Sequence, residues 1–135
     1  MAFYSKKSNK CWILKAVDRK TRKCIAYVVG KRDIQTVHKL FEKIKHLDAI
    51  FYTDHWEAFK AVIPKERHVI GKKHTITIEQ NNSNTRHHLG RMTRRTKVVS
   101  KTKEMVDLTM RLWINVNQTQ EFDRLRDIFL SSIYK

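Results

Sequence analysis

Two short apolar runs near the start of the chain predict an antiparallel hairpin. Residues Cys11–Val17 and Cys24–Gly30 are rich in β-branched and aromatic side chains, and a charged link, 18–23, separates them. Runs of this length, bounded by polar turn residues, are typical of strands. Ahead of them, Ala2–Tyr4 is only a stub, so we expect the first strand of the sheet to be incomplete.

Apolar residues then recur with a period near 3.6, which predicts an amphipathic helix that Asp33 can cap. A third apolar run, Ala49–Thr53, ends abruptly on Asp54 and is expected to be a buried strand. A short helix should follow and stop before Pro64, the only proline. One more short strand is predicted within Glu66–Gly71. The apolar positions of the first of these helices are Ile34, Val37, Leu40, Phe41, Ile44 and Leu47.

The second half of the chain reads as helical. A long polar helix is predicted to begin near Thr77, because Thr77 and Gln80 have the spacing of a capping box. Ser100 is expected to cap the next helix, and a last amphipathic helix follows a Gln-rich joint at 117–120. This order of elements predicts an α/β fold, a mixed sheet flanked by helices. The expected core positions are Met105, Leu108, Leu112, Trp113 and Val116, and the apolar positions of the last, amphipathic helix are Phe122, Leu125, Phe129 and Ile133.

Charge narrows the choice of partner. The chain has 29 Lys and Arg against 13 Asp and Glu, a formal net charge of +16 over 135 residues. This excess favours a polyanionic partner, and nucleic acid is the commonest one, although a generally basic surface is the simpler alternative. No apolar run approaches a membrane span and no signal peptide is visible, so we expect a soluble, cytoplasmic protein. Cys11 and Cys24 lack metal-ligand spacing and are expected to be buried thiols.

Two carboxylates could hold a divalent cation. Asp54 follows a predicted buried strand, and Glu79 opens the polar helix some 25 residues later. Mg²⁺ prefers such hard oxygen ligands, although its phosphodiester chemistry commonly needs about three converging carboxylates. Arg86 stands two helical turns after Glu79 on the same helix face and could clamp a phosphate. The simpler alternatives are that Asp54, with Glu57 three residues later, caps a helix, and that Glu79 is favoured there by the helix dipole.

Basic residues continue along and beyond the polar helix. Their density, without compensating acids, favours contact with nucleic-acid phosphates over a merely solvated face. His68 and His74, on either side of a short loop, are weak candidates for a shared metal, and the three tryptophans are expected to belong to the core. The candidate phosphate-binding residues are Arg86, Arg91, Arg94, Arg95, Lys97 and Lys101.

Four blocks of the sequence, in order, resemble transposases of the bacterial IS-one type. They are Cys11–Lys23 (CWILKAVDRKTRK), Val28–Gly30 (VVG), Tyr52–Phe59 (YTDHWEAF) and Ile78–Arg86 (IEQNNSNTR). The resemblance spans residues 3 to 117. Four blocks in the right order are more specific than any single motif.

The resemblance implies a DDE-type catalytic domain with a ribonuclease-H-like fold, which cuts and joins the DNA ends of its insertion sequence with Mg²⁺ or Mn²⁺. Asp54 matches the family's second catalytic aspartate, Glu79 its catalytic glutamate, and Arg86 the basic position that follows. Asp54 and Glu79 are therefore expected to be catalytic metal ligands. The implied partners are insertion-sequence ends and target DNA, with a homo-oligomer as the active complex.

The sequence differs from the family pattern at the start of the chain. The family's first catalytic aspartate lies in an Asp-Glu pair just ahead of an aromatic segment like Ala2–Tyr4, and the N-terminal zinc-binding and helix-turn-helix region is not seen here either. We therefore expect residues 1–117 to be a catalytic domain without its first-Asp strand, followed by a helical extension, 118–135. Such a chain should bind DNA without strand transfer, and a companion protein could recognise the ends. The alternatives are a non-catalytic basic module that binds DNA or RNA, and another nuclease of the same fold.

Overall fold

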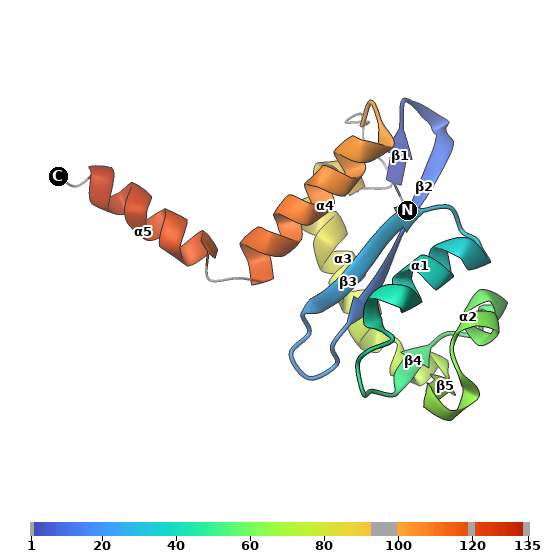
Figure 1. Ribbon diagram of the computed structural model, residues 1–135. Coiled ribbons are helices and arrows are strands. Elements are labelled where there is room, and N and C mark those ends of the chain that lie inside the picture. The colour runs from blue at the N-terminus through green and yellow to red at the C-terminus, as the bar shows by residue number, and fades with distance from the viewer. Residues whose placement is uncertain (1, 93–99, 119–120, 134–135) are drawn as a thin grey trace.

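The computed structural model describes residues 2–92, 100–118 and 121–133 (Figure 1). It is a mixed α/β structure in which the strands come early in the chain and the longest helices late. The strands are β1 (Ala2–Tyr4), β2 (Lys6–Val17), β3 (Cys24–Gly30), β4 (Phe51–Thr53) and β5 (His68–Ile70). The helices are α1 (Ile34–Ile44), α2 (Glu57–Val62), α3 (Ile76–His88), α4 (Lys103–Gln118) and α5 (Glu121–Ile133), with short 3₁₀ turns η1 (Lys65–Arg67), η2 (Lys72–His74) and η3 (Gly90–Met92).

The predicted hairpin is confirmed. β2 and β3 pair antiparallel with Ile13 opposite Val29, and β1 adds to the other edge of β2. β4 and β5 pair parallel, with Phe51 opposite His68. The expectation of one mixed sheet is not met in the described residues, where the strands form a three-stranded and a two-stranded sheet. β1 and β4 have only three residues each, which limits the ladders they can form.

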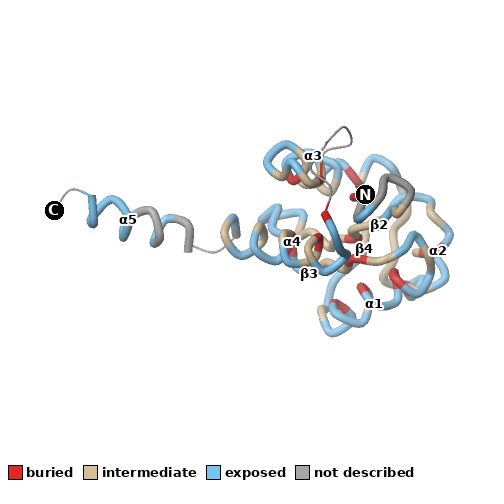
Figure 2. The backbone as a smooth tube through the Cα atoms, turned by 90° about the horizontal axis from the view of Figure 1, so that it is seen from above, coloured by how far each residue is buried: buried red, intermediate tan, exposed pale blue. Residues whose placement is uncertain are grey.

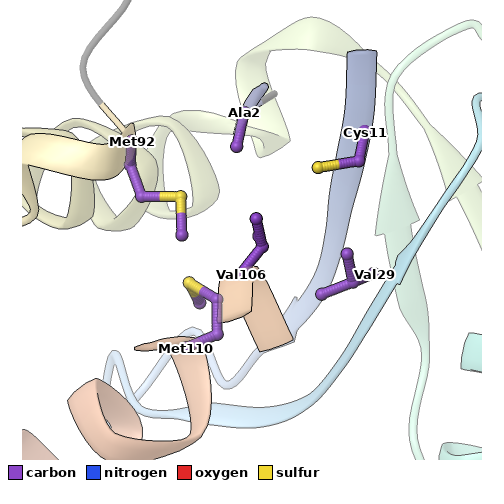
Figure 3. Close-up of a cluster of buried hydrophobic side chains, with 6 residues drawn as sticks. All are labelled: Ala2, Cys11, Val29, Met92, Val106 and Met110. Atoms are coloured by element: carbon purple, nitrogen blue, oxygen red, sulfur yellow. The ribbon is translucent and has the colours of Figure 1, made fainter. Parts of the chain in front are cut away.

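Helices cover both faces of the β2–β3 hairpin. One face presents Cys11 and Val29 to a cluster that includes Val106 and Met110 of α4 (Figure 3). The opposite face presents Leu14 to a cluster with Val37 and Leu40 of α1 and Ala58 of α2. Successive side chains of a strand point to opposite faces, so the apolar run Cys11–Leu14 in β2 supplies both clusters. The result is a sheet with α1 and α2 on one side and α3 and α4 on the other.

α1 begins as the sequence predicted. Asp33 occupies the N-cap, and its carboxylate accepts hydrogen bonds from the backbone amide of Thr36 at 2.8 Å and from its hydroxyl at 2.7 Å. The buried Thr36 side chain lies directly over Gly30 of β3, where a Cβ would stand 2.5 Å from the threonine oxygen. Glycine is therefore required here by the close approach of the helix to the strand.

Two predicted helix caps were wrong. α3 begins at Ile76, with Thr75 rather than Thr77 at its N-cap position, so Thr77 lies inside the first turn. In α4, the Thr102 hydroxyl accepts the Met105 amide at 3.3 Å, the bond that was expected of Ser100. Ser100 is instead buried, and its carbonyl accepts a hydrogen bond from the Ser5 amide. In α4 a neighbouring hydroxyl thus makes the expected capping contact, whereas the side chain of Thr75 makes no capping hydrogen bond at the start of α3.

The predicted core face of α4 was also partly wrong. Val106 and Met110 are fully buried, whereas Leu108 and Leu112 are each 63% exposed. The Tyr27 hydroxyl donates to the Asp107 carbonyl at 3.2 Å, which fixes α4 against β3 in this rotation. The side chains of Phe122 and Leu125, expected on the apolar face of α5, lie outside the described set. Within the described part of the chain, no helix is long and apolar enough to cross a membrane.

Gly30→Ala should test the close approach of α1 to β3. The added methyl group would overlap the Thr36 side chain, which Asp33 holds in place, so we expect a loss of about 1–3 kcal/mol in the free energy of unfolding. Urea denaturation measures this loss. The matched control, Gly90→Ala, places its Cβ where no atom lies within 4 Å and should change stability much less. Equal losses in both variants would contradict the steric explanation.

Candidate metal and nucleic-acid site

Asp54 lies directly after β4 at the end of the short parallel sheet, as predicted, but the strand was wrongly expected to be buried: β4 is half-buried, and Ala49 and Ile50 ahead of it are exposed. Its carboxylate is exposed, and Oδ1 accepts a hydrogen bond from the Trp56 amide at 3.1 Å. The N-cap position of α2 is Trp56, so Asp54 makes a turn two residues ahead of the helix instead of the predicted cap. Among the described residues no group bonds Oδ2, which leaves this oxygen available to a ligand.

Glu79 lies in the first turn of α3, also with an exposed side chain. The hydroxyl of the buried Thr75 lies 3.1 Å from Oε1 of Glu79 and 2.8 Å from the carbonyl of Lys72, and its single proton can serve one of them at a time. Thr75 therefore holds the glutamate near the start of the helix. This contact was missed because Thr77 was taken as the capping residue.

The end of β4 and the start of α3 are joined through η2. The Gly71 amide donates to the Thr53 carbonyl at 3.0 Å, and the His74 ring lies 5.0 Å from the ring of Tyr52. Thr75 and α3 follow directly, so the two elements that carry Asp54 and Glu79 adjoin at one end of the short sheet. No group of three or more His, Cys, Asp or Glu side chains able to hold a metal is found in the described ranges.

The chemistry of the donors fits a hard divalent cation. Both carboxylates are exposed, and neither is taken up by an ion pair with a basic residue in the described part of the molecule. Two carboxylates with several waters are a common ligand set for Mg²⁺. The histidines are otherwise engaged: His68 Nε2 lies 2.6 Å from the Thr53 hydroxyl, and His74 contacts Tyr52. The pKa of His68 is lowered, first by burial and then by Lys60, which favours the neutral ring.

The candidate phosphate-binding residues follow α3 away from the carboxylates. Arg86 lies seven residues after Glu79 in one continuous helix, hence on the same side and about 10 Å along the axis. Beyond the helix, an Arg91 guanidinium nitrogen lies 3.5 Å from the Ser100 hydroxyl, which brings Arg91 close to Lys101. Arg94, Arg95 and Lys97 lie outside the described residues.

Lys15 is a contributor that the sequence analysis missed. Its ammonium group donates to the Asn81 side-chain oxygen at 3.0 Å and to the Thr85 hydroxyl at 2.6 Å, which ties β2 to the middle of α3. The pKa of Lys15 is lowered from 10.5 to about 8, chiefly by burial; Cys24 opposes the shift and the nearby Arg86 adds to it. Lys15 alternates with Cys11 and Ile13 on a buried face, and this period-2 position was the available signal.

Asn81 adds a second attachment, since its amide nitrogen donates to the Arg22 carbonyl at the hairpin turn. The bond is long, at 3.4 Å. Together, Lys15 and Asn81 fix α3 against the hairpin between Glu79 and Arg86. The polar middle of α3 thus packs against the hairpin, and this contact determines where the Glu79 carboxylate and the Arg86 guanidinium lie.

The tryptophans are not simply core residues. Trp12 and Trp56 are half-buried against the α1 and α2 cluster, as expected, but the Arg32 guanidinium lies 5.1 Å from both rings. Trp113 stacks on His88 at 5.2 Å. Arg19 from the hairpin turn lies over Tyr52, two residues before Asp54, at 4.5 Å. Two arginine side chains therefore rest on aromatic rings that lie within two residues of Asp54 in the sequence, Tyr52 and Trp56. Cys11 and Cys24 are buried free thiols, as predicted.

These features define a basic α/β protein with two exposed carboxylates beside a helix that leads to further cations. Comparison with known proteins agrees with this class. The family model of IS1 transposases matches residues 1–120, and the chain belongs to that family.

Individual relatives are similar over most of the chain. The insertion element IS1 protein InsB of Shigella flexneri is 31% identical over 115 residues, covering 84% of this chain and 88% of the relative. The insertion element IS1 2 protein InsB of Escherichia coli K12 is also 31% identical over 115 residues, covering 84% and 69%. No solved structure matches. Family membership implies a role in DNA transposition.

Lys15→Met should change how stability depends on pH. Between about pH 8 and 10.5 the unfolded chain holds a proton on Lys15 that the folded chain has released, so the free energy of unfolding contributed by this group rises with pH. Chemical denaturation of both proteins across this window measures the difference. The wild type should gain stability relative to Lys15→Met as the pH rises. Parallel profiles would show that the pKa of Lys15 is not lowered in the folded state.

Proposed function

We propose that this chain forms most of a domain that cleaves and joins insertion-sequence DNA once a third carboxylate is supplied, with Asp54 and Glu79 as two ligands of a catalytic Mg²⁺ or Mn²⁺. The observation that carries the proposal is that β4, η2 and α3 bring the elements of both exposed carboxylates to one end of the short sheet. Family membership supplies the reaction class. The bound cation would activate an attacking oxygen and stabilise a leaving one at a phosphodiester.

The chain's own residues would position the DNA. In this proposal Arg86 takes the phosphate next to the carboxylates, and Arg91 and Lys101 take phosphates further along. Glu79 and Arg86 are separated by roughly 10 Å along the axis of α3, about three nucleotide steps of one strand. The proposal extends to Arg94, Arg95 and Lys97, whose positions in the chain lie between Arg91 and Lys101. In this proposal Lys15 holds α3 in the position on the sheet at which Glu79 can bind the metal and Arg86 the neighbouring phosphate.

The proposed site needs a further ligand, because two carboxylates fall short of the roughly three that this chemistry uses. The resemblance assigns the missing one to an Asp-Glu strand ahead of Ala2–Tyr4, and β1 is the edge strand next to β2. We also propose that the sheet with helices on both faces is the ribonuclease-H-like core, and that the catalytic domain ends near residue 117. The proposed partners are insertion-sequence ends, target DNA and a companion protein that recognises those ends.

A second candidate function is a basic module that binds DNA or RNA without chemistry. One observation favours it: the described residues contain no three-ligand metal group. Such a module would bind nucleic acid equally well with either carboxylate neutralised. The two functions therefore differ in what Asp54 and Glu79 do.

Divalent metal binding should depend on both carboxylates. Asp54→Asn and Glu79→Gln should each weaken Mn²⁺ binding by about tenfold or more, because each removes one of two charged ligands. Electron paramagnetic resonance titration with Mn²⁺ measures the free ion. Glu66→Gln, an exposed carboxylate on η1, makes the same charge change and should leave the affinity unaltered. In a longer chain that supplies the Asp-Glu strand, both variants should abolish metal-dependent cutting and joining; survival of activity would sink the assignment.

The affinity for DNA should fall steeply as the salt concentration rises, and the proposed phosphate-binding residues should account for part of this dependence. Lys101→Ala should lower affinity and reduce the slope of log K against log salt by about 1, as expected for one lost phosphate contact. Fluorescence anisotropy with a duplex oligonucleotide between 50 and about 200 mM salt covers the informative range. Lys39→Ala, on the exposed side of α1 in the opposite helix layer, is the control. A larger effect at Lys39 would place the DNA on the other face.

A further inference from the structure

Charge and apolar surface are divided between two parts of the chain. Residues 1–102 contain 24 Lys and Arg against 8 Asp and Glu and carry the whole formal charge of +16, whereas residues 103–135 contain 5 of each and are neutral. We call residues 103–133 the helical arm, because they comprise α4 and α5. One side of α4 packs on the sheet, whereas α5 projects away from it (Figure 1).

The arm also carries most of the exposed apolar side chains. Of ten large hydrophobic residues exposed in the described part of the chain, six lie on α4 and α5. Figure 2 shows the described parts of α5 exposed over their whole length. These six residues, with exposed fractions of 41 to 63%, are Leu108, Leu112, Ile128, Phe129, Leu130 and Ile133.

The exposed side of α4 is separate from the side that holds the domain together. Val106 and Met110 point into the core, and Leu108 and Leu112, two residues on from each, lie about 160° away around the helix. Leu108 and Leu112 are one turn apart and so form one continuous apolar ridge. This ridge cannot reach the chain's own core without unpacking Met110.

We propose that the arm is the surface through which two copies of this chain associate, by helix-to-helix contact of their α4 and α5 apolar faces. The division of charge supports a second copy as the occupant. Two bodies of +16 repel each other and attract DNA, whereas two neutral arms can meet without electrostatic cost. Mixed-sign charges flank the apolar residues, as suits a surface that meets itself about a two-fold axis.

The arm is long enough for a stable contact. α4 has 16 residues and α5 has 13, which corresponds to about 43 Å of helix. An interface of ordinary size needs about 800 Å² from each partner. The family model ends at residue 120, so α5 lies outside the part shared with IS1 transposases. The proposed contact is thus partly this chain's own, and it leaves the carboxylates and the α3 cations free for DNA.

The molar mass in solution tests the proposal. Sedimentation equilibrium of the DNA-free wild-type chain should give twice the single-chain mass of 16.2 kDa, both near physiological salt and at about 1 M NaCl, where contacts to phosphates are screened. Leu112→Asp and Phe129→Asp should each raise the dimer dissociation constant at least tenfold. Ile34→Asp, 55% exposed at the start of α1, adds the same charge and should leave the dimer intact.

Three results would overturn the inference. They are a wild-type chain that remains a monomer up to about 100 μM, a dimer that dissociates in Ile34→Asp as readily as in Phe129→Asp, and a dimer unaffected by all three variants. A monomer that sediments with phospholipid vesicles would assign the arm to a membrane surface and would also overturn it. Circular dichroism checks that each variant folds. None of these results depends on Asp54, Glu79 or DNA, so the proposed catalytic function stands or falls separately.

Discussion

Burial of both faces of the β2–β3 hairpin is the constraint on which the remaining structure depends. An antiparallel hairpin with one solvated face would alternate polar and apolar residues, but β2 is apolar at nearly every position from Cys11 to Val17. Each face must therefore be covered. α1 and α2 cover the Leu14 side, and α3 and α4 cover the Cys11 side. The long-range contacts of the molecule follow from this arrangement.

Lys15 is the exception within that apolar strand, and it connects the fold to the proposed site. An ammonium group at an inward position must find acceptors, and Asn81 and Thr85 of α3 provide them. A helix whose middle is polar, and which would be poorly held by hydrophobic contact alone, is thereby fixed on the sheet. Glu79 and Arg86 lie on either side of this attachment. The position of the candidate chemistry thus depends on a polar contact in the α3 layer.

The helical arm obeys a different constraint. Its neutral charge and exposed apolar side chains contrast with a body that carries all the net positive charge. Repulsion between positively charged bodies opposes their self-association, and a separate surface of zero net charge allows copies to meet. This separation keeps phosphate contacts and protein contacts on different parts of one short chain.

The sequence by itself determined the hairpin, the Asp33 cap, the positions of Asp54 and Glu79 at element ends, and the family. These features depend on local patterns of apolar, turn and capping residues, which are read within a few positions. Tertiary structure alone decided that the Thr75 hydroxyl lies beside Glu79 and that Thr102 makes the contact expected of Ser100. It also decided that α4 is rotated to bury Val106 and Met110 instead of Leu108 and Leu112, and that Lys15 holds α3. A helix with apolar residues on two sides has two possible inward faces, and only the partners it packs against choose between them.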